Sequence, residues 1–169
     1  MALHGSKCVA GFTLVELVVV LILVGILAAV AGPRFVDRTA EQRGFRDAAK
    51  AAIQHARHVA VASRRFVCVI LTPGPGPAGL LGLRMDTNEP EAVAAINCAT
   101  NVAMPVADRN CANPNEVCAP NGVTLGGGGV IFDALGRSVT APNVLAAVVN
   151  VAITGQPNIT VQPETGYVQ

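Results

Sequence analysis

The sequence predicts an α+β protein in which a long N-terminal helix packs on an antiparallel β-sheet head. Apolar residues dominate 12–31, apolar residues recur at helical spacing over 34–65, and short β-rich runs between turn residues fill 66–169. A chain of 169 residues has room for one such helix and one modest domain. We therefore divide it into a short leader (1–11), an apolar helical half (12–33), an amphipathic helical half (34–65) and a β-rich head (66–169).

The apolar half carries one unusual charge. Phe12 to Ala31 comprises twenty residues, of which only Glu16 ionises. As a helix this stretch would span roughly 30 Å, the thickness of the hydrocarbon core of a bilayer. A carboxylate inside such a segment costs on the order of 2.5–3.5 kcal/mol and needs a partner. If the chain is cleaved after Gly11, the new α-amino group of Phe12 lies one helical turn from Glu16 and can pair with it.

The run Gly-Phe-Thr-Leu-Val-Glu at 11–16, followed by an apolar helix, resembles the prepilin signature of type IV pilins and type II secretion pseudopilins. The resemblance implies that a prepilin peptidase and methyltransferase cleaves between Gly11 and Phe12 and methylates Phe12. It also implies that Glu16 guides subunits into a helical filament, through contacts with other pilin or pseudopilin subunits, an inner-membrane assembly platform and the lipid bilayer. No enzyme activity, cofactor or metal is implied.

The leader and the end of the apolar half suggest an orientation. Residues 1–11 include Lys7 and no acidic residue, as expected for a cytoplasmic N-terminus with the head in the periplasm and later on a filament or the cell surface. Pro33 lacks a backbone N–H and disfavours helical geometry at Gly32, so we expect a kink or local unwinding there.

Three other interpretations of the apolar run remain open. A buried helix of a soluble protein is the least favoured, because a stretch of 18 or more apolar residues with few charges is typical of a membrane span. A plain membrane anchor would explain the apolar residues but not Glu16. A conventional secretory signal would be cleaved between Ala31 and Gly32, but its apolar region is usually shorter, about 7–15 residues, and carries no charge.

The second half of the helix is amphipathic. Its apolar stripe repeats at spacings of four and three, comprising Phe45, Ala49, Ala52, Ala56, Val59 and Ser63, with Ile53 and Ala60 widening it. The opposite face comprises Arg43, Arg46, Lys50, Gln54 and Arg57. His55 and His58 are three residues apart without a third ligand, so we interpret them as solvated side chains. The many alanines suggest a close approach to a sheet.

Four cysteines remain if Cys8 is lost with the leader, an even number that suits an extracytoplasmic head with disulfides. Four cysteines allow three pairings, of which we favour Cys111–Cys118, closing a short loop, and Cys68–Cys98, joining a strand to the connecting segment. A zinc site formed by the cysteines would need a pair of them two to four residues apart, which is absent.

The head is expected to contain strands at 66–71, 80–85, 123–125, 130–132, 148–153 and 158–161, with a closing edge at 166–168. The segment 73–77 is interpreted as a turn or exposed loop, 97–121 as irregular, and the four glycines at 126–129 as a flexible loop. In the acidic loop 86–91, Asp86, Asn88 and Glu91 are conceivable calcium ligands, although their spacing matches no calcium motif. The 130–137 and 159–168 segments resemble the heads of H-type minor pseudopilins and related minor pilins. The Ala-Gly-Pro-Arg-Phe junction at 31–35 and Cys68 resemble mannose-sensitive haemagglutinin pilus proteins.

Charge and composition narrow the functional classes. Residues 34–65 hold eight basic residues against three acidic ones, a balance of +5, whereas 66–169 hold three against seven, a balance of −4. This distribution suits contacts between the head of one subunit and the stem of another, or simply a solvated helix face. Three scattered histidines and no nucleophile–base grouping argue against an enzyme. A DNA-binding subunit at a filament tip is the alternative, with phosphate contacts from Arg64, Arg65, Arg109 and Arg137, but an acidic head without interleaved aromatic residues argues against nucleic acid.

Overall fold

The structure is a computed structural model that describes residues 13–90 and 95–169, and the side chains of all of these except 29–37. The expected leader, Gly11 and Phe12 lie outside the described residues, as does Glu91. The chain divides into two compact units, Met1–Asp37 and Arg38–Gln169.

Helix α1, Leu14–Ser63, is the one long helix among the described residues. It continues through Gly32 and Pro33, so the local unwinding expected at this position is not observed. Pro33 removes a single donor from the helical ladder. Because helix propagation is cooperative, the hydrogen bonds of the turns on either side can maintain the helix across that gap.

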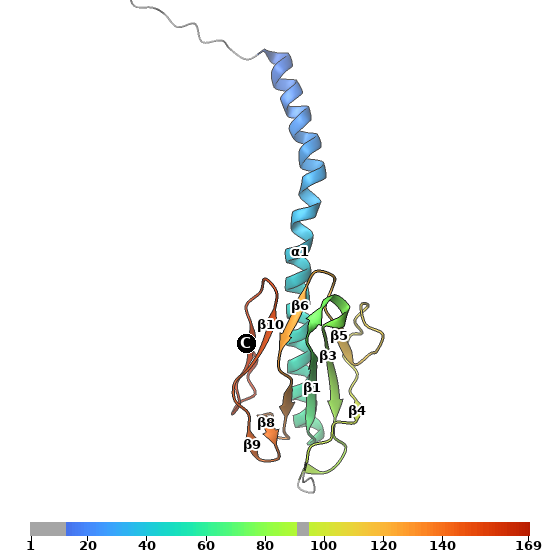
Figure 1. The fold of residues 1–169 in the computed structure, drawn as a ribbon, viewed down its shortest axis with the longest axis vertical. Helices are drawn as coiled ribbons and strands as arrows, with labels where there is room; N and C mark the ends of the chain where they lie inside the picture. The colour runs from blue at the N-terminus through green and yellow to red at the C-terminus, as the bar shows by residue number, and fades with distance from the viewer. Residues whose placement is uncertain (1–12, 91–94) are drawn as a thin grey trace, which may run out of the picture. The chain divides into compact units, whose positions relative to one another are not determined.

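The head contains two antiparallel sheets (Figure 1). Seven strands form the first in the order β4-β3-β1-β7-β8-β9, with β5 also pairing with β3. Their bounds are β1 Val67–Thr72, β3 Leu80–Met85, β4 Thr100–Asn101, β5 Glu116–Cys118, β7 Val130–Phe132, β8 Ser138–Ala141 and β9 Val144–Leu145. The second sheet has the order β11-β10-β6-β2, with bounds β2 Gly74–Pro75, β6 Thr124–Gly127, β10 Val149–Ile153 and β11 Ile159–Val161. A short 3₁₀ helix, η1 Gly76–Ala78, follows β2.

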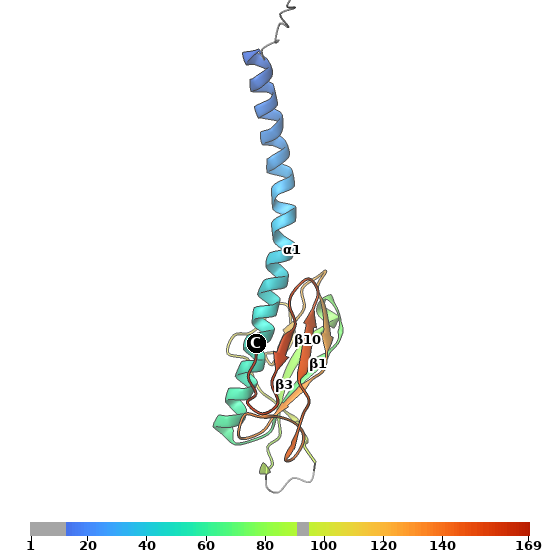
Figure 2. The ribbon, with the colours of Figure 1, turned by 90° about the vertical axis from the view of Figure 1, so that its left-hand side faces the viewer.

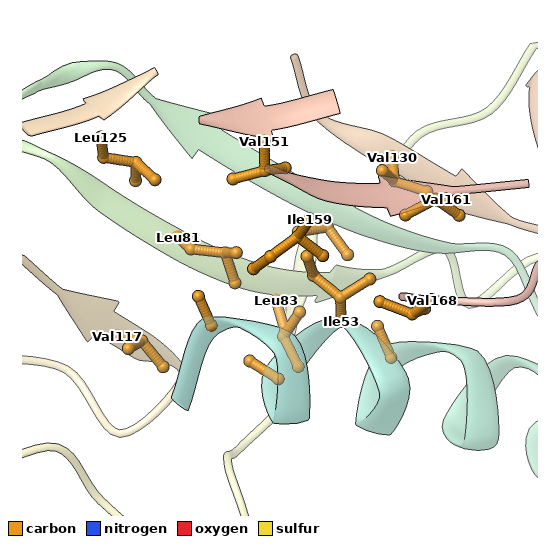
Figure 3. Close-up of a cluster of buried hydrophobic side chains, with 14 of the residues drawn as sticks. Ile53, Leu81, Leu83, Val117, Leu125, Val130, Val151, Ile159, Val161 and Val168 are labelled. Carbon is orange, nitrogen blue, oxygen red and sulfur yellow. The ribbon is translucent and has the colours of Figure 1, made fainter. Parts of the chain in front are cut away.

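The two sheets and the second half of α1 share one hydrophobic core, and in Figure 2 the strands lie to one side of this part of the helix. The helix contributes small side chains and two large ones, Phe45 and Ile53, all buried. Figure 3 shows Ile53 pointing from the helix toward the sheets, with Leu83 from β3 and Ile159 from β11 nearby. The predicted α+β architecture, a helix packed on antiparallel strands, is therefore confirmed.

The predicted apolar stripe is largely the buried face of the helix. Phe45, Ala49, Ala52, Ala56 and the widening residues Ile53 and Ala60 are buried, and Val59 is partly buried. The inclusion of Ser63 was wrong: it is exposed, and its hydroxyl donates to the Val59 carbonyl oxygen at 2.7 Å. The helix ends at Ser63, and the last position of the predicted stripe is therefore not packed against a sheet.

Most predicted strands are present with the expected pairing. β1 and β3 pair antiparallel, with Val67 opposite Met85, and β10 pairs with β11, with Val151 opposite Ile159. The predicted closing edge is the bridge between Val161 and Val168.

Two segments that were expected to lack strands contain short ones. The segment 73–77, expected to be a turn or exposed loop, contains β2, which pairs with β6, and the start of η1. The segment 97–121, expected to be irregular, contains β4 and β5 on the same edge of β3. Strands of two or three residues contain too little sequence to show a period of two, and pairing with distant residues decides whether they form.

The four glycines also differ from the expected flexible loop. Gly126 and Gly127 belong to β6 in the second sheet, and Gly128 and Gly129 lead directly to β7 in the first. Gly127 has φ +109°, and a Cβ there would collide with the Asn150 carbonyl; a Cβ at Gly129 would lie 2.6 Å from the Val69 carbonyl oxygen. The glycines are therefore needed because the backbone crosses between two sheets at close range.

Candidate assembly site

The first turn of α1 places Glu16 at a helix cap. Helix α1 begins at Leu14, and the Glu16 backbone N–H donates to Thr13 Oγ1 at 3.2 Å. A Thr followed three residues later by Glu is the pattern of a capping box, in which the threonine hydroxyl accepts from the third helical N–H. A carboxylate in the first turn is also favoured by the positive end of the helix dipole. The sequence contained this capping signal, but our interpretation of Glu16 considered only its pairing with Phe12.

The helix beyond this cap exposes large apolar side chains on every side. Their exposed fractions range from 44% at Val18 to 79% at Leu14. The exposed set comprises Leu14, Val15, Leu17, Val18, Val19, Val20, Leu21, Ile22, Leu23, Val24, Ile26 and Leu27. Among the residues that the structure describes, no helix is both long enough and apolar enough to cross a membrane. A contiguous apolar surface of this extent on a protein marks a site of interaction.

The four head cysteines form two disulfides, Cys68–Cys98 and Cys111–Cys118, with Cα atoms 6.1 Å and 5.5 Å apart. These are the pairings that the sequence favoured. The first joins β1 to the connecting segment before β4, and the second closes a seven-residue separation that ends in β5. Each bridge therefore joins a strand of the first sheet to a segment outside the regular strands.

The calcium candidate Asp86 has a different role. Its side chain is fully buried, its Oδ1 accepts from the backbone and side-chain N–H groups of Asn88 at 2.9 and 2.8 Å, and its Oδ2 accepts from the Asn97 backbone N–H at 2.7 Å. Burial by itself raises the pKa of Asp86, but these hydrogen bonds, with Arg65 contributing, outweigh it and hold the pKa below 3.8. Asp86 therefore ties residues 88 and 97 to the end of β3 through hydrogen bonds, and Asn88 acts as a hydrogen-bond donor to it. Glu91 lies outside the described residues.

Two other aspartates organise turns in the same way. Asp133, 6% exposed, accepts from the backbone N–H groups of Leu135 and Arg137 and forms an ion pair with the Arg137 guanidinium at 2.7 Å. Asp108 accepts from the backbone N–H groups of Asn110 and Cys118 at 2.9 and 3.0 Å. Part of the negative charge of the head is thus used within the subunit. Arg137, one of the four arginines considered for DNA, is also engaged.

The basic face of the helix likewise contacts its own head. Arg46 Nε donates to the Pro157 carbonyl oxygen at 2.9 Å, and Arg57 Nε donates to the Gly136 carbonyl oxygen at 3.3 Å. We expected this face to contact the head of another subunit or to be solvated. Arg46 and Arg57 instead contact loops of the head in their own chain. His55 Nε2 lies 3.3 Å from the Ala103 carbonyl oxygen, so it too contacts the head, whereas His58 is exposed.

A groove lies between the helix and the loop that precedes β5. It has a volume of about 660 Å³ and is lined mainly by apolar side chains, including Phe45, Met104 and Val117, with Glu41 and Arg109 among its polar residues. Sequence reasoning did not identify it, because its two walls are about sixty residues apart in the chain.

Comparisons with known proteins identify a family motif near the N-terminus. Residues 6–32 match the prokaryotic N-terminal methylation motif. The chain is 44% identical over 59 residues to the type IV narrow pilus major component PilA5 of Thermus thermophilus, an alignment that covers 34% of this chain and 50% of the relative. The chain therefore spans about half the length of that curated relative. It is also similar to the crystal structure of the type IV minor pilin FimU of Pseudomonas aeruginosa, at 16% identity over 75% of this chain and 90% of that chain, with a TM-score of 0.42.

Proposed function

We propose, from the match to the N-terminal methylation motif and the similarity to a type IV pilus component, that the chain is a structural subunit of a type IV pilus or of a type II secretion pseudopilus. The proposal that it is a minor subunit rests on the resemblance of segments 130–137 and 159–168 to the heads of minor pseudopilins and minor pilins. The observation that carries the proposal is the exposed apolar stretch of helix Leu14–Leu27, which lies within the methylation motif and carries a single carboxylate, Glu16, in its first turn. A surface of this kind needs a cover, and lipid followed by the same helix of other subunits would supply it. The role is one of assembly rather than catalysis.

The proposed order of events begins in the inner membrane, with the N-terminus in the cytoplasm and the head in the periplasm. A prepilin peptidase removes residues 1–11 and methylates Phe12, and an assembly platform then transfers the subunit into the filament. The α-amino group of Phe12, from the same or a neighbouring subunit, pairs with Glu16. Capping by Thr13 supports this step, because it holds the first turn of the helix in place for the pairing.

The alternative is a minor pilin at a filament tip that binds DNA or a surface ligand. Of the four arginines considered, Arg64 and Arg109 are exposed, whereas Arg137 is engaged with the buried Asp133. Binding of labelled DNA by the chain at low salt would favour this alternative.

The maturation step is tested by mass spectrometry of protein extracted from membranes. We expect a mature chain that begins with methylated Phe12, and accumulation of the unprocessed chain when Gly11 is replaced by a bulky residue. A mature chain beginning at Gly32 would identify a conventional signal peptide and contradict the proposal.

The assembly step is tested with Glu16→Ala, using Glu164→Ala, which removes an exposed carboxylate of the head, as the control. We expect both variants to reach the membrane and to be cleaved after Gly11, and only Glu16→Ala to be strongly depleted from sheared filaments. Normal incorporation of Glu16→Ala would remove Glu16 from the mechanism.

Two other measurements test the class of subunit and the type of filament. The amount of wild-type chain relative to the other filament subunits measures whether it is a minor subunit. Loss of secreted proteins in a deletion strain would identify a pseudopilus.

A further inference from the structure

The loop between Asp108 and Cys118 gathers four groups that bind soft divalent metals. Cys111 Sγ, Cys118 Sγ and a carboxylate oxygen of Glu116 all lie within 4.8 Å of one another. Asp108 Oδ2 lies 3.8 Å from Cys111 Sγ. Two sulfurs and two carboxylates in one short loop form a complete set of four ligands, the number that a closed zinc site uses.

We propose that, in its dithiol form, this loop is a binding site for a thiophilic divalent cation such as Zn²⁺, with Cys111, Cys118, Glu116 and Asp108 as its ligands. Metal–ligand bonds of about 2.3 Å to sulfur and about 2.1 Å to oxygen imply ligand separations of roughly 3.4–3.8 Å in a tetrahedron. The two sulfurs are bonded to each other in the disulfide, so in the dithiol form they move apart to reach this separation, whereas the Glu116 oxygen moves inward by at most about 1 Å. The exposed residues 112–114 of the loop leave room for both movements.

The two carboxylates are already oriented by hydrogen bonds. Asp108 Oδ2 accepts from the Cys118 backbone N–H at 3.0 Å, and Glu116 Oε1 accepts from the Asn113 side-chain amide at 3.0 Å. Groups that orient metal ligands in this way commonly raise metal affinity. Each carboxylate retains lone pairs for a cation.

Metal binding and the disulfide exclude each other. Binding replaces the two thiol protons, which pass to solvent, and leaves both sulfurs as thiolates. Oxidation by a disulfide-containing oxidant transfers two electrons from the two thiolates to that oxidant and forms the Cys111–Cys118 bond. The oxidant leaves as two thiolates, which take up two protons from solvent, and the cation is released. The site therefore belongs to the stage before the head is oxidised.

The other pair, Cys68–Cys98, provides a matched comparison. Cys68 lies in β1 opposite Arg84 of β3 and Ile131 of β7. Within residues 13–90 and 95–169, the only group of three or more metal-binding side chains is the one that contains Cys111 and Cys118. A metal that simply followed free thiols would bind both pairs, whereas the proposed site binds at one.

The experiment uses the full chain in detergent, with Cys8→Ser, fully reduced by a phosphine that is then removed under anaerobic conditions. Cd²⁺ is added as the probe and alkylation of each cysteine is followed by peptide mass spectrometry. We expect one Cd²⁺ per chain, visible by sulfur-to-cadmium charge-transfer absorption, and at least tenfold slower alkylation of Cys111 and Cys118, with Cys68 and Cys98 unchanged. Zn²⁺ should displace the Cd²⁺ signal.

Substitutions test the carboxylates. Glu116→Gln and Asp108→Asn should each weaken Cd²⁺ binding about tenfold or more, while Glu164→Gln, an exposed change elsewhere in the head, should not. Equal protection of all four cysteines, or no protection of any, would overturn the proposal. Unchanged affinity in both carboxylate variants would overturn the assignment of the ligands. The alkylation experiment itself uses only the Cys8→Ser chain, so it does not depend on the folding of the carboxylate variants.

Discussion

The two halves of helix α1 are both rich in apolar residues, yet they meet opposite environments. Around Leu14–Leu27 large apolar side chains cover the whole circumference and are exposed, whereas Phe45–Ala60 presents a narrow stripe that is buried against the two sheets. The difference lies in pattern rather than in apolar content. An apolar stripe on one side of a helix can be buried against a single surface of the head. A helix that is apolar on all sides can be buried only in an apolar solvent such as lipid, or by several partner chains at once.

The largest expected effect comes from making one substitution in both halves. Ile53 is fully buried and Ile22 is 55% exposed. Ile53→Ala should destabilise the head by about 2–5 kcal/mol, because it removes buried methyl groups and leaves a cavity, whereas Ile22→Ala should change stability by less than about 0.5 kcal/mol. Urea unfolding of the detergent-solubilised chain, followed by circular dichroism, measures both. Similar losses in the two variants would mean that the first half of the helix also packs within its own subunit.

The sequence predicted the halves of the helix well because their signals are local. The spacing from Phe45 to Ala60 located the buried face, and paired β-rich runs located β1, β3, β10 and β11. Five strands were missed: β2, β4, β5, β8 and β9. β2, β4 and β5 exist through pairing with a strand distant in the sequence, and no pattern of their own reveals them. The crossing at Gly127–Gly129 depends on the carbonyl oxygens of Val69 and Asn150, which no local pattern reveals.

The candidate site divides in the same way. The methylation motif is contiguous, so the sequence was sufficient to identify it. The roles of Asp86 and Arg46 depend on backbone groups about ten and more than one hundred residues away, so composition suggested a calcium ligand and a solvated cation instead. Charge balance alone could not show that carboxylates of the head are used inside it.

Removing the disulfides should destabilise the head and leave the exposed half of helix α1 unchanged, because both bridges lie in the head. Chain-entropy estimates give about 3.6 kcal/mol for a bridge with a separation of 30 residues and about 2.4 kcal/mol for one of 7. Cys68→Ser with Cys98→Ser should therefore lower the urea midpoint more than Cys111→Ser with Cys118→Ser. The helicity of 14–28 should remain in both. The reverse order would show that the short loop, not the link to β1, holds the head together.

Acid should weaken the head through Asp86 but not the exposed half of the helix. The pKa of the Asp86 carboxyl is held below 3.8, so folding favours its ionised form. The stabilisation is complete above about pH 3.8, the value in the unfolded chain, and is lost as the pH falls through the lower pKa of the folded state. Asp86→Asn should lower the free energy of unfolding by about 1–3 kcal/mol at neutral pH, because buried donors lose a charged acceptor. This difference from wild type should shrink as the pH falls through the pKa of Asp86 in the folded state. Glu164→Gln, which alters an exposed side chain, serves as the control. A difference that stays constant down to pH 2 would assign the loss to packing.

The smallest expected effect separates two arginines on the same helix. Arg46 Nε donates to the Pro157 carbonyl oxygen in the turn between β10 and β11, whereas Arg43 is exposed. A hydrogen bond at a partly exposed site contributes about 1 kcal/mol, so Arg46→Gln should lower stability by about that amount and Arg43→Gln by almost nothing. Amide hydrogen exchange gives the local measurement: Arg46→Gln should speed exchange in 154–158 without affecting β1 or β3. If both variants behave alike, the turn is held by its own hydrogen bonds, such as Gln156 N–H to the Ile153 carbonyl at 3.0 Å, and the helix only borders it.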